Sequence, residues 1–466
     1  MQASVGLHQI LQANTQRHLD DLIELLRIPS VSAADVHASD VMLAAKWVAA
    51  RMKRAGVENV ALHPTGPHAC ITGDWLHAPG KPTILLYGHF DVQPADPLEL
   101  WDTPPFEPHI ADGRIYARGA ADMKGNLLLC LIAVEALLAA TGELPVNVKF
   151  LFEGQEEIGS RDLAPFVAAN RELLACDLVL TPDGGQWAEG QPAMMMGTKG
   201  VCVLQIDLET AEMDLHSGIY GGAVPNAVHE LVALLGSMRG SDGRILVEGF
   251  YDQVVPLTAE ERAALAEVPF DADEYRAPLG IDSLVGEPGF STYERAWARP
   301  TLEVNGIWGG YQGDGVKTVI PAKAHAKITC RLVANQDPDT VLEKLEAHIA
   351  RHRPAGRVSV TRQAGKARAY SMPATHPGAQ AVAGVLAEQY GRPPYYVRSG
   401  GTLPIMDMFL QELNAYTVDV GFALDDERMH SPNEFFRLAD YERGQAVYAL
   451  LLERLGCLDP RSLAVR

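Results

Sequence analysis

Hydrophobic and polar positions along the first 200 residues alternate between helix-like and strand-like patterns. Apolar residues recur with helical spacing over Leu11–Leu26, Val41–Met52 and Leu127–Ala140. Short, mostly apolar runs rich in branched or aromatic residues occupy Thr83–Tyr87, Val146–Phe152 and Asp177–Thr181, as is typical of strands buried on both faces. This alternation predicts an α/β sheet with helices on both of its faces.

A different order of elements begins near Thr198. The patterns predict strands at Val201–Leu208, Thr301–Val304, Ala324–Val333 and Val358–Arg362, and helices at Asn226–Met238 and Pro338–Ala350. The resulting order, βαββαβ, is that of the ferredoxin-like split motif. The charged, glycine-rich and proline-rich stretch from Gly240 to Pro300 is then a long excursion within this motif.

The α/β pattern resumes after Pro373. We expect helices near Gln380–Gln389, Leu403–Leu410 and Tyr441–Leu455, and a strand over Ala415–Val420. The sequence therefore predicts a mixed-sheet α/β catalytic domain formed by residues 1–197 and 373–466. An α+β insert formed by residues 198–372 interrupts this domain.

Charge and composition restrict the partners of this chain. The 466 residues include 39 Lys and Arg against 59 Asp and Glu, so the formal net charge is −20. Such a chain repels phosphate backbones and anionic lipid, so we expect no nucleic-acid or membrane partner. The six cysteines are scattered singly, which indicates buried thiols in a reducing compartment.

The sequence also predicts neither a signal peptide nor a membrane-spanning segment. His8, Arg17, Asp20 and other polar residues interrupt the N-terminal apolar positions, so no signal-peptide core forms there. The apolar run Leu127–Val134 stops at Glu135, short of the roughly 20 residues that span a bilayer. We therefore expect a soluble, cytoplasmic protein.

Residue types that ligate metals follow the predicted buried strands, and ligands of open α/β sheets bind beyond the carboxyl ends of strands. His89 and Asp91 follow the first strand. On an extended segment they share a face, so Asp91 can hydrogen-bond the imidazole of His89, as carboxylates do behind metal-bound histidines. The alternative is a core histidine followed by an aspartate that caps a turn.

Glu156 and Glu157 follow the second strand, between Gly154 and Gly159. Glycines permit the chain to bend, so one carboxylate could ligate a metal while its neighbour accepts a proton from water. Acid pairs are also common on solvated faces, but this pair comes soon after the apolar end of a buried strand. The position of this glutamate pair therefore favours a functional role over a solvated surface pair.

Three further residues complete a candidate set. Asp183 follows the third strand and could simply form an Asp-Gly turn; Asp122 precedes an apolar helix and could simply be its N-cap; His430 lies in a polar loop. Together with His89 and Glu157, they supply two imidazoles and three carboxylates. Two divalent metals about 3.5–4 Å apart need about this many ligands, with one carboxylate bridging.

These residues carry a resemblance to the co-catalytic di-zinc metallopeptidases, the family of carnosinase, cytosolic nonspecific dipeptidase, glutamate carboxypeptidase, acetylornithine deacetylase and succinyl-diaminopimelate desuccinylase. The resemblance covers nearly the whole chain. The matching segments are Gly88–Pro94, Arg118–Gly125, Glu153–Ser160, Thr181–Gly184, His216–Gly222, Lys317–Pro321, Gly400–Pro404 and His430–Glu434. Three segments resemble the dipeptidase branch more than the shorter deacylases: Leu215–Gly222, the long excursion from Gly240 and the glycine-rich segment Gly306–Gly315.

The resemblance implies a role for each matching residue. Asp122 bridges two metals and is followed by a cis peptide; His89 and Asp183 complete one site, and Glu157 and His430 the other. Glu156 is the general base, Asp91 supports His89, and His216 reaches the partner subunit's active site in dimeric members to stabilise the oxyanion. The implied substrate contacts are Asn226, Thr318, Arg331 and Thr402, the last a position where relatives often carry Ser.

We therefore expect a metal-dependent hydrolase that cleaves the amide bond of dipeptides or short peptides with a hydroxide bridging two divalent metals. Zn²⁺ is favoured, and Mn²⁺ also suits such ligands. Arg331 is the expected partner of the substrate carboxylate, with Arg398 as the alternative. The competing functions are N-acyl amino-acid deacylation or desuccinylation and a non-catalytic metal- or peptide-binding relative. The resemblance also implies a homodimer, with the insert acting as lid or dimerisation domain.

Overall fold

The computed structural model describes residues 2–352 and 354–465, and the chain forms two compact units. The first unit comprises Met1–Met196, Met372–Tyr396 and Met408–Arg466, and the second comprises Gly197–Ser371 and Val397–Asp407. Residues 397–407 thus belong with the second unit, although their sequence pattern predicts the catalytic part. The role of the insert as a lid or dimerisation domain stays a prediction.

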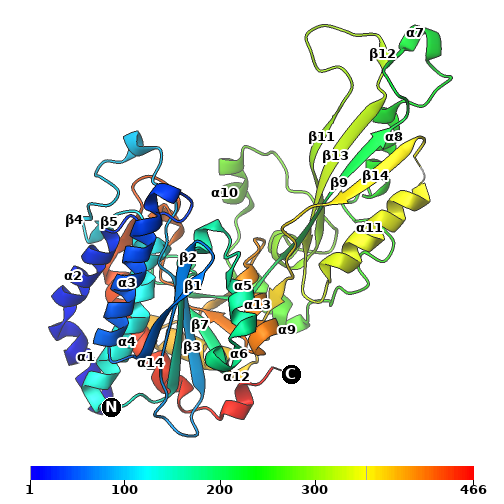
Figure 1. Ribbon diagram of the computed structural model, residues 1–466. Helices are drawn as coiled ribbons and strands as arrows, with labels where there is room; N and C mark the ends of the chain where they lie inside the picture. The colour runs from blue at the N-terminus through cyan, green and yellow to red at the C-terminus, as the bar shows by residue number, and fades with distance from the viewer. Residues whose placement is uncertain (1, 353, 466) are drawn as a thin grey trace. The chain divides into compact units, whose positions relative to one another are not determined.

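A mixed sheet forms the centre of the first unit (Figure 1). Seven of its nine strands are β1 (Glu58–Thr65), β2 (His68–Trp75), β3 (Thr83–His89), β6 (Asn147–Glu153), β7 (Leu178–Thr181), β8 (Ala193–Thr198) and β17 (Thr417–Asp419), in the order β1-β2-β6-β3-β7-β17-β8. The other two, β15 (Tyr370–Ser371) and β16 (Tyr395–Ser399), both pair with β8. β3 pairs in parallel with both β6 and β7. These three strands are almost wholly buried, which confirms that they are covered on both faces.

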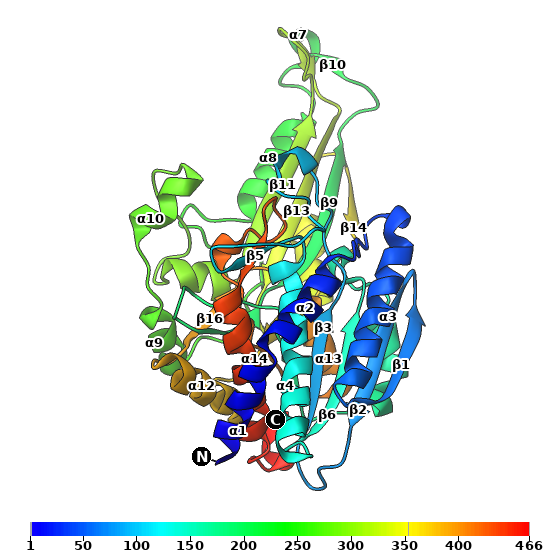
Figure 2. The same cartoon turned by 90° about the vertical axis from the view of Figure 1, so that its left-hand side faces the viewer.

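Helices cover the two faces of this sheet. They are α1 (Gln2–Ala13), α2 (Thr15–Leu26), α3 (Ala38–Arg54), α4 (Gly125–Thr141), α5 (Leu163–Ala169), α6 (Arg171–Leu174), α12 (Pro377–Tyr390), α13 (Pro404–Leu413) and α14 (Leu438–Leu455). Figure 1 shows α3 and α4 on one face and α5 on the other, and Figure 2 shows α14 beside α4. The predicted helix Leu11–Leu26 is wrong as one element, because Asn14 separates α1 from α2.

Helix α4 is apolar on every side, and from Gly125 to Val134 each of its residues is buried. The helical stretch Ala120–Thr141 is long and apolar enough to cross a membrane, and 78% of its most apolar window is buried inside the protein. Our expectation that no stretch reaches that length is therefore wrong. The burial of α4 explains its composition, because a helix packed all round needs no polar face.

Shorter elements complete the first unit. A small sheet contains β4 (His109–Ala111), β5 (Arg114–Tyr116) and β18 (Phe435–Arg437), in the order β18-β5-β4. Single helical turns are η1 (Asp35–His37), η2 (Leu98–Leu100), η3 (Ala120–Lys124), η4 (Glu156–Ile158), η7 (Asp425–Glu427) and η8 (Pro460–Leu463). η3 leads into α4 and η4 follows the buried strand β6, and both turns carry candidate site residues.

The second unit has the predicted βαββαβ order. Its main elements are β9 (Gly200–Glu209), α8 (Ala227–Ser237), β11 (Thr301–Gly309), β13 (Lys323–Leu332), α11 (Pro338–His352) and β14 (Arg357–Arg362). The antiparallel sheet has the order β11-β13-β9-β14. Along β9 buried and half-buried residues alternate, and the buried set joins residues of α8 and α11 in one hydrophobic core, as a sheet covered on one face requires.

Small elements extend this unit. They are β10 (Leu215–His216), α7 (Ser217–Tyr220), α9 (Ala259–Glu267), α10 (Ala272–Arg276), η5 (Ala277–Leu279), η6 (Glu294–Ala298), β12 (Val319–Ile320), β15 (Tyr370–Ser371) and, at its boundary, β16 (Tyr395–Ser399).

Across the two units, the six cysteines are free thiols. Four of them are buried, but Cys176 is half-buried and Cys457 is exposed, so the expectation of six buried thiols is wrong for these two.

Candidate metal centre

The carboxyl ends of three parallel strands meet at one edge of the sheet in the first unit. β3 ends at His89, which lies opposite Glu153 at the end of β6, and β7 ends two residues before Asp183. The predicted strand Thr83–Tyr87 is two residues short, because the buried run continues through Gly88 to His89. The turns after these strands bring their polar side chains to the same edge.

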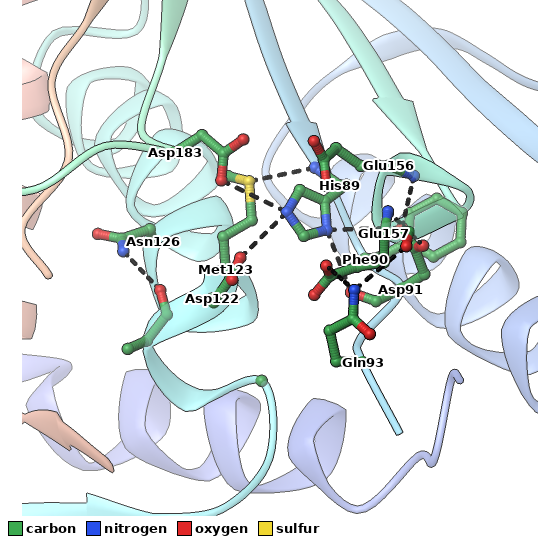
Figure 3. Close-up of polar contacts among 12 residues, drawn as sticks. His89, Phe90, Asp91, Gln93, Asp122, Met123, Asn126, Glu156, Glu157 and Asp183 are labelled. Atoms are coloured by element: carbon green, nitrogen blue, oxygen red, sulfur yellow. Dashed lines mark hydrogen bonds and ion pairs between the residues drawn. The ribbon is translucent and has the colours of Figure 1, made fainter. Parts of the chain in front are cut away.

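One group of possible ligands contains His89, Asp122 and Asp183, whose ligand atoms lie within 4.8 Å of one another. In Figure 3 the side chains of the two aspartates point toward the imidazole of His89. His89 Nε2 lies 3.3 Å from Asp122 Oδ1 and 3.4 Å from Asp183 Oδ1. Burial lowers the pKa of His89, but the carboxylates of Asp183 and Asp122 outweigh it and raise that pKa well above its usual value.

A second group contains Asp122, Glu157 and His430, again with ligand atoms within 4.8 Å of one another. His430 Nε2 lies 2.8 Å from Asp122 Oδ2 and 3.2 Å from Glu157 Oε2. The carboxylates of Asp122 and Glu157 raise the pKa of His430 to about 10. The five residues predicted as ligands therefore converge from five separate segments of the chain.

Asp122 belongs to both groups and turns a different oxygen to each, Oδ1 to His89 and Oδ2 to His430. The Asp122–Met123 peptide is cis, as the family resemblance implies. The alternative that Asp122 caps a helix is wrong, since α4 begins at Gly125 and Lys124 occupies its N-cap position. A carboxylate with one oxygen for each of two groups has the geometry of a bridging ligand.

The donor set fits two divalent cations. Two imidazoles and three carboxylates converge, and the buried His89 Nε2 faces carboxylate oxygens at 3.3 and 3.4 Å without a well-aligned hydrogen bond to any described residue. A buried nitrogen of this kind needs a partner, and a cation between it and the two carboxylates would be one. The arrangement can thus hold a pair of metals in the first unit.

Asp91 supports this group more extensively than the sequence predicted. His89 Nδ1 lies 3.1 Å from the Asp91 backbone oxygen and 3.5 Å from Oδ1 of its carboxylate, so the nearer partner is the backbone carbonyl. The Asp91 carboxylate accepts the backbone N–H groups of Glu156 and Glu157, each at 3.2 Å. Asp91 therefore orients both the histidine and the turn that carries the two glutamates.

The carboxyl group of Glu156 lies among other acidic side chains. Burial, reinforced by Asp183 and Glu157, raises the pKa of Glu156 to about 8, although His89 opposes the shift. At that pKa the carboxyl group exchanges its proton close to neutral pH, the range in which general acids and bases work. Its place beside both ligand groups makes Glu156 the candidate for proton transfer.

The other candidate residues lie in the second unit. Arg331 Nη1 donates to Thr402 Oγ1 at 2.7 Å, which brings two predicted substrate contacts together. Asn226 caps α8, accepting from the N–H groups of Val228 and His229, and the Thr318 carbonyl accepts from Ser217. Arg398, the alternative guanidinium, pairs with Glu261.

His216 is exposed in the second unit and forms the start of α7. Its Nδ1 accepts a hydrogen bond from the backbone N–H of Gly218 at 3.0 Å. The neutral ring then carries its proton on Nε2. His216 is therefore set to donate a hydrogen bond through Nε2.

Two residues that support the site, Gln93 and Glu434, had no role of their own in the prediction from sequence. Gln93 Nε2 donates to Glu157 Oε2 at 2.8 Å. The buried Glu434 accepts from the backbone of the segment that carries Asp122. Both lie in segments that carry the resemblance, but only their tertiary contacts give them a role.

Comparisons with known proteins agree with this site. The model of the family described as Peptidase family M20/M25/M40 matches residues 85–454. The chain is 32% identical over 403 residues to a Beta-Ala-His dipeptidase of Rattus norvegicus, covering 85% of this chain and 81% of that protein. It is 29% identical over 479 residues to the Cys-Gly metallodipeptidase dug1 of Schizosaccharomyces pombe, covering 97% and 98%.

A solved structure is similar over the same length. The M20 family metallo-carboxypeptidase Sso-CP2 from Sulfolobus solfataricus superposes with a TM-score of 0.78 and 32% identity, covering 95% of this chain and 99% of that one. The family match spans most of the chain and includes all five convergent ligands. The chain therefore belongs to peptidase family M20/M25/M40 and is a metallopeptidase.

Proposed function

We propose that this chain hydrolyses the amide bond of dipeptides or short peptides that end in a free carboxylate. The observation that carries the proposal is the pair of ligand groups joined by Asp122. The names of two relatives, a Beta-Ala-His dipeptidase and a Cys-Gly metallodipeptidase, support dipeptides as the substrate class. The carboxypeptidase Sso-CP2 supports cleavage next to a C-terminal residue.

In this proposal His89 and Asp183 would hold one cation, Glu157 and His430 would hold the other, and Asp122 would be the ligand that the two share. Imidazole and carboxylate ligands suit Zn²⁺, which we favour, and Mn²⁺. Two such cations, when bound, supply Lewis acidity that activates a water and polarises the substrate carbonyl. The five side chains fix the positions of both charges relative to Glu156.

Glu156 acts as the general base. Its carboxylate takes a proton from the attacking water, and the same carboxyl group then returns a proton to the leaving amine. Burial gives this carboxyl group a raised pKa, and cations bound beside it would favour the carboxylate form that accepts the proton. Asp91 keeps the Glu156 backbone in place through the Glu156 N–H.

His216 donates a hydrogen bond from Nε2 to the oxyanion that forms when water adds to the carbonyl. The contact between its Nδ1 and the Gly218 N–H supports this role, since it leaves the proton on Nε2. In dimeric members of the family the matching histidine acts in the partner subunit. We propose the same arrangement for this chain.

Arg331 and Thr402 hold the substrate carboxylate, because their side chains already contact each other and both can donate to oxygen. Asn226 and Thr318 contribute further polar contacts to the substrate. A deacylase acting on N-acyl amino acids would need the same carboxylate site. The dipeptidase names of the relatives favour peptides over that alternative.

We further propose that the chain is a homodimer of the cytoplasm that binds neither nucleic acid nor membranes. The edge strand β11 exposes Val304, Ile307 and Trp308, and an unpaired apolar edge of this kind favours pairing with another chain. Six free thiols support the cytoplasmic location. The net charge of −20 supports the exclusion of nucleic acid and membranes as partners. Sedimentation of wild type and of Ile307→Lys tests the dimer, which the charge should weaken.

The function is tested by stripping the protein with a chelator and refilling it separately with Zn²⁺ and Mn²⁺. Release of amino acids is then followed from Cys-Gly, β-Ala-His, Ala-Ala and N-acetylated amino acids. We expect metal-dependent turnover of dipeptides that exceeds turnover of the N-acyl substrates. Preferred turnover of the N-acyl substrates would establish the deacylase, and metal binding without any turnover would establish a binding protein.

A further inference from the structure

Glu434 is fully buried and accepts four hydrogen bonds from the segment that leads to Asp122. Oε2 accepts from Arg118 Nη1 at 2.7 Å and from the Gly119 N–H at 3.0 Å. Oε1 accepts from the Ala121 N–H at 3.0 Å and the Asp122 N–H at 3.1 Å. Both oxygens therefore face donors only.

The backbone that Glu434 contacts leaves helical geometry. Gly119 has a φ of +83°, and Asp122 and Met123 have φ/ψ values of −118°/97° and −128°/26° within η3. In such a segment the N–H groups lose the regular partners that a helix provides. The carboxylate of Glu434 supplies these partners from a distant part of the chain.

Glu434 also connects the two halves of the ligand set. It follows His430 by four residues, and its carboxylate contacts the N–H of Asp122, which shares one ligand group with His430. On the other side of the segment, Asn126 Nδ2 donates to the Ala121 carbonyl at 2.9 Å. The position of Asp122 is thus fixed from two sides.

We propose that Glu434 is a positioning residue that sets how Asp122 divides its two oxygens between His89 and His430. It acts through the backbone of Gly119–Asp122 and touches neither metal nor substrate. The proposal rests on the role of Asp122 as bridging ligand put forward above. Loss of the Glu434 carboxylate should therefore weaken metal binding more than it weakens substrate binding.

A simpler role for Glu434 is to neutralise the buried guanidinium of Arg118, which also donates to the Pro94 carbonyl at 3.1 Å. The two roles differ in the response to an amide. In Glu434→Gln, one carboxylate oxygen becomes an NH₂ group, which cannot accept a hydrogen bond. The two N–H donors on that side then lose their acceptor. Adding Arg118→Gln removes the unpaired charge but does not restore the missing acceptor.

The experiment compares wild type, Glu434→Gln and the double variant Glu434→Gln/Arg118→Gln. Zn²⁺ affinity and stoichiometry are measured by competition with a chromophoric chelator, and kcat and KM for a dipeptide are measured at saturating Zn²⁺. We expect about 10- to 100-fold weaker Zn²⁺ binding in both variants, the usual loss for residues that orient ligands. At saturating Zn²⁺, KM should stay within about twofold of wild type, and kcat should exceed the value that the same variant gives at limiting Zn²⁺.

Wild-type Zn²⁺ affinity in Glu434→Gln would overturn the proposal. Wild-type Zn²⁺ affinity in the double variant would also overturn it, because Glu434 would then act only as the partner of Arg118. If Glu434→Gln is insoluble, Glu434→Asp keeps the charge and shortens the side chain, and the same criterion applies to it. Failure of the wild type to bind two Zn²⁺ per chain would instead refute the proposed function. The two failures are therefore distinguishable.

Discussion

The carboxylate of Asp91 accepts the backbone N–H of Glu156 at 3.2 Å, so the residue behind a metal-site histidine also holds the residue proposed as general base. Its second oxygen accepts the N–H of Glu157. Asp91 is fully buried. One side chain thus links the position of a ligand group to the position of the base.

We expect Asp91→Asn to lower both kcat and metal affinity, because the amide NH₂ group would face a backbone N–H donor. Residues that orient metal ligands typically contribute about 10- to 100-fold. Chelator competition and steady-state kinetics measure the two effects. Asp74→Asn, a change in a half-buried aspartate on β2, serves as the control and should leave both values unchanged; equal behaviour of the two variants would contradict the role of Asp91.

Glu156→Gln should remove the proton acceptor while leaving the five ligands in place. General acid–base catalysis is worth about 10²–10⁴-fold, so we expect kcat to fall by that factor with two metals still bound per chain. Metal content by atomic emission spectroscopy checks the second part. Glu157→Gln is the informative comparison, since it should lose metal; the assignment of roles is wrong if Glu156→Gln loses metal and Glu157→Gln keeps it.

The ligands could be predicted from the sequence because each follows a recognisable buried strand or a family motif. His89 ends one strand and Glu157 follows another, and the apolar composition of both strands marks them as central. The supporting contacts could not be predicted in this way. Glu434 meets Ala121 and Asp122 only after the chain has folded, and no local pattern specifies which buried N–H groups a distant carboxylate will accept.

The dependence of side-chain contacts on the folded structure also explains two predictions that were wrong, those for Asp122 and for helix α4. The N-cap interpretation of Asp122 is reasonable for an aspartate before an apolar helix, yet here the chain departs from helical geometry at Asp122 and its side chain turns to His89 and His430. Helix α4 has a composition that suits a membrane, and only its packing inside the first unit accounts for it. Composition and spacing predict elements, whereas side-chain direction depends on tertiary contacts.

His216→Ala should depress turnover without affecting metal binding. Loss of one oxyanion donor typically costs about 10²–10³-fold in kcat, and His216 belongs to a different unit from the five ligands. Zn²⁺ titration and kinetics test both statements. His352→Ala, which removes an exposed histidine of α11 in the same unit, should keep wild-type kcat; a loss of bound Zn²⁺ in His216→Ala would contradict the assigned role.

Lys199 predicts a pH dependence of stability. It is 2% exposed, donates to the Arg295 carbonyl at 3.2 Å, and its backbone N–H contacts the Gly401 carbonyl beside Thr402. Burial, with Arg331 as the next cause, lowers the pKa of Lys199 to about 8. In the unfolded chain a lysine pKa is about 10.4, so between these values the unfolded state binds more protons and the free energy of unfolding rises with pH.

We therefore expect Lys199→Met to flatten that rise between pH 8 and 10 and, at pH 7, to increase the free energy of unfolding by about 1–2 kcal/mol, because a desolvated charge is removed. The same change should raise KM for dipeptides, since one cation near Arg331 is lost. Urea unfolding at several pH values and steady-state kinetics provide the measurements. A variant whose free energy of unfolding climbs with pH as steeply as that of wild type would show that Lys199 is not the titrating group. Increased stability with weaker substrate binding would show that the second unit retains this buried charge for function at the expense of stability.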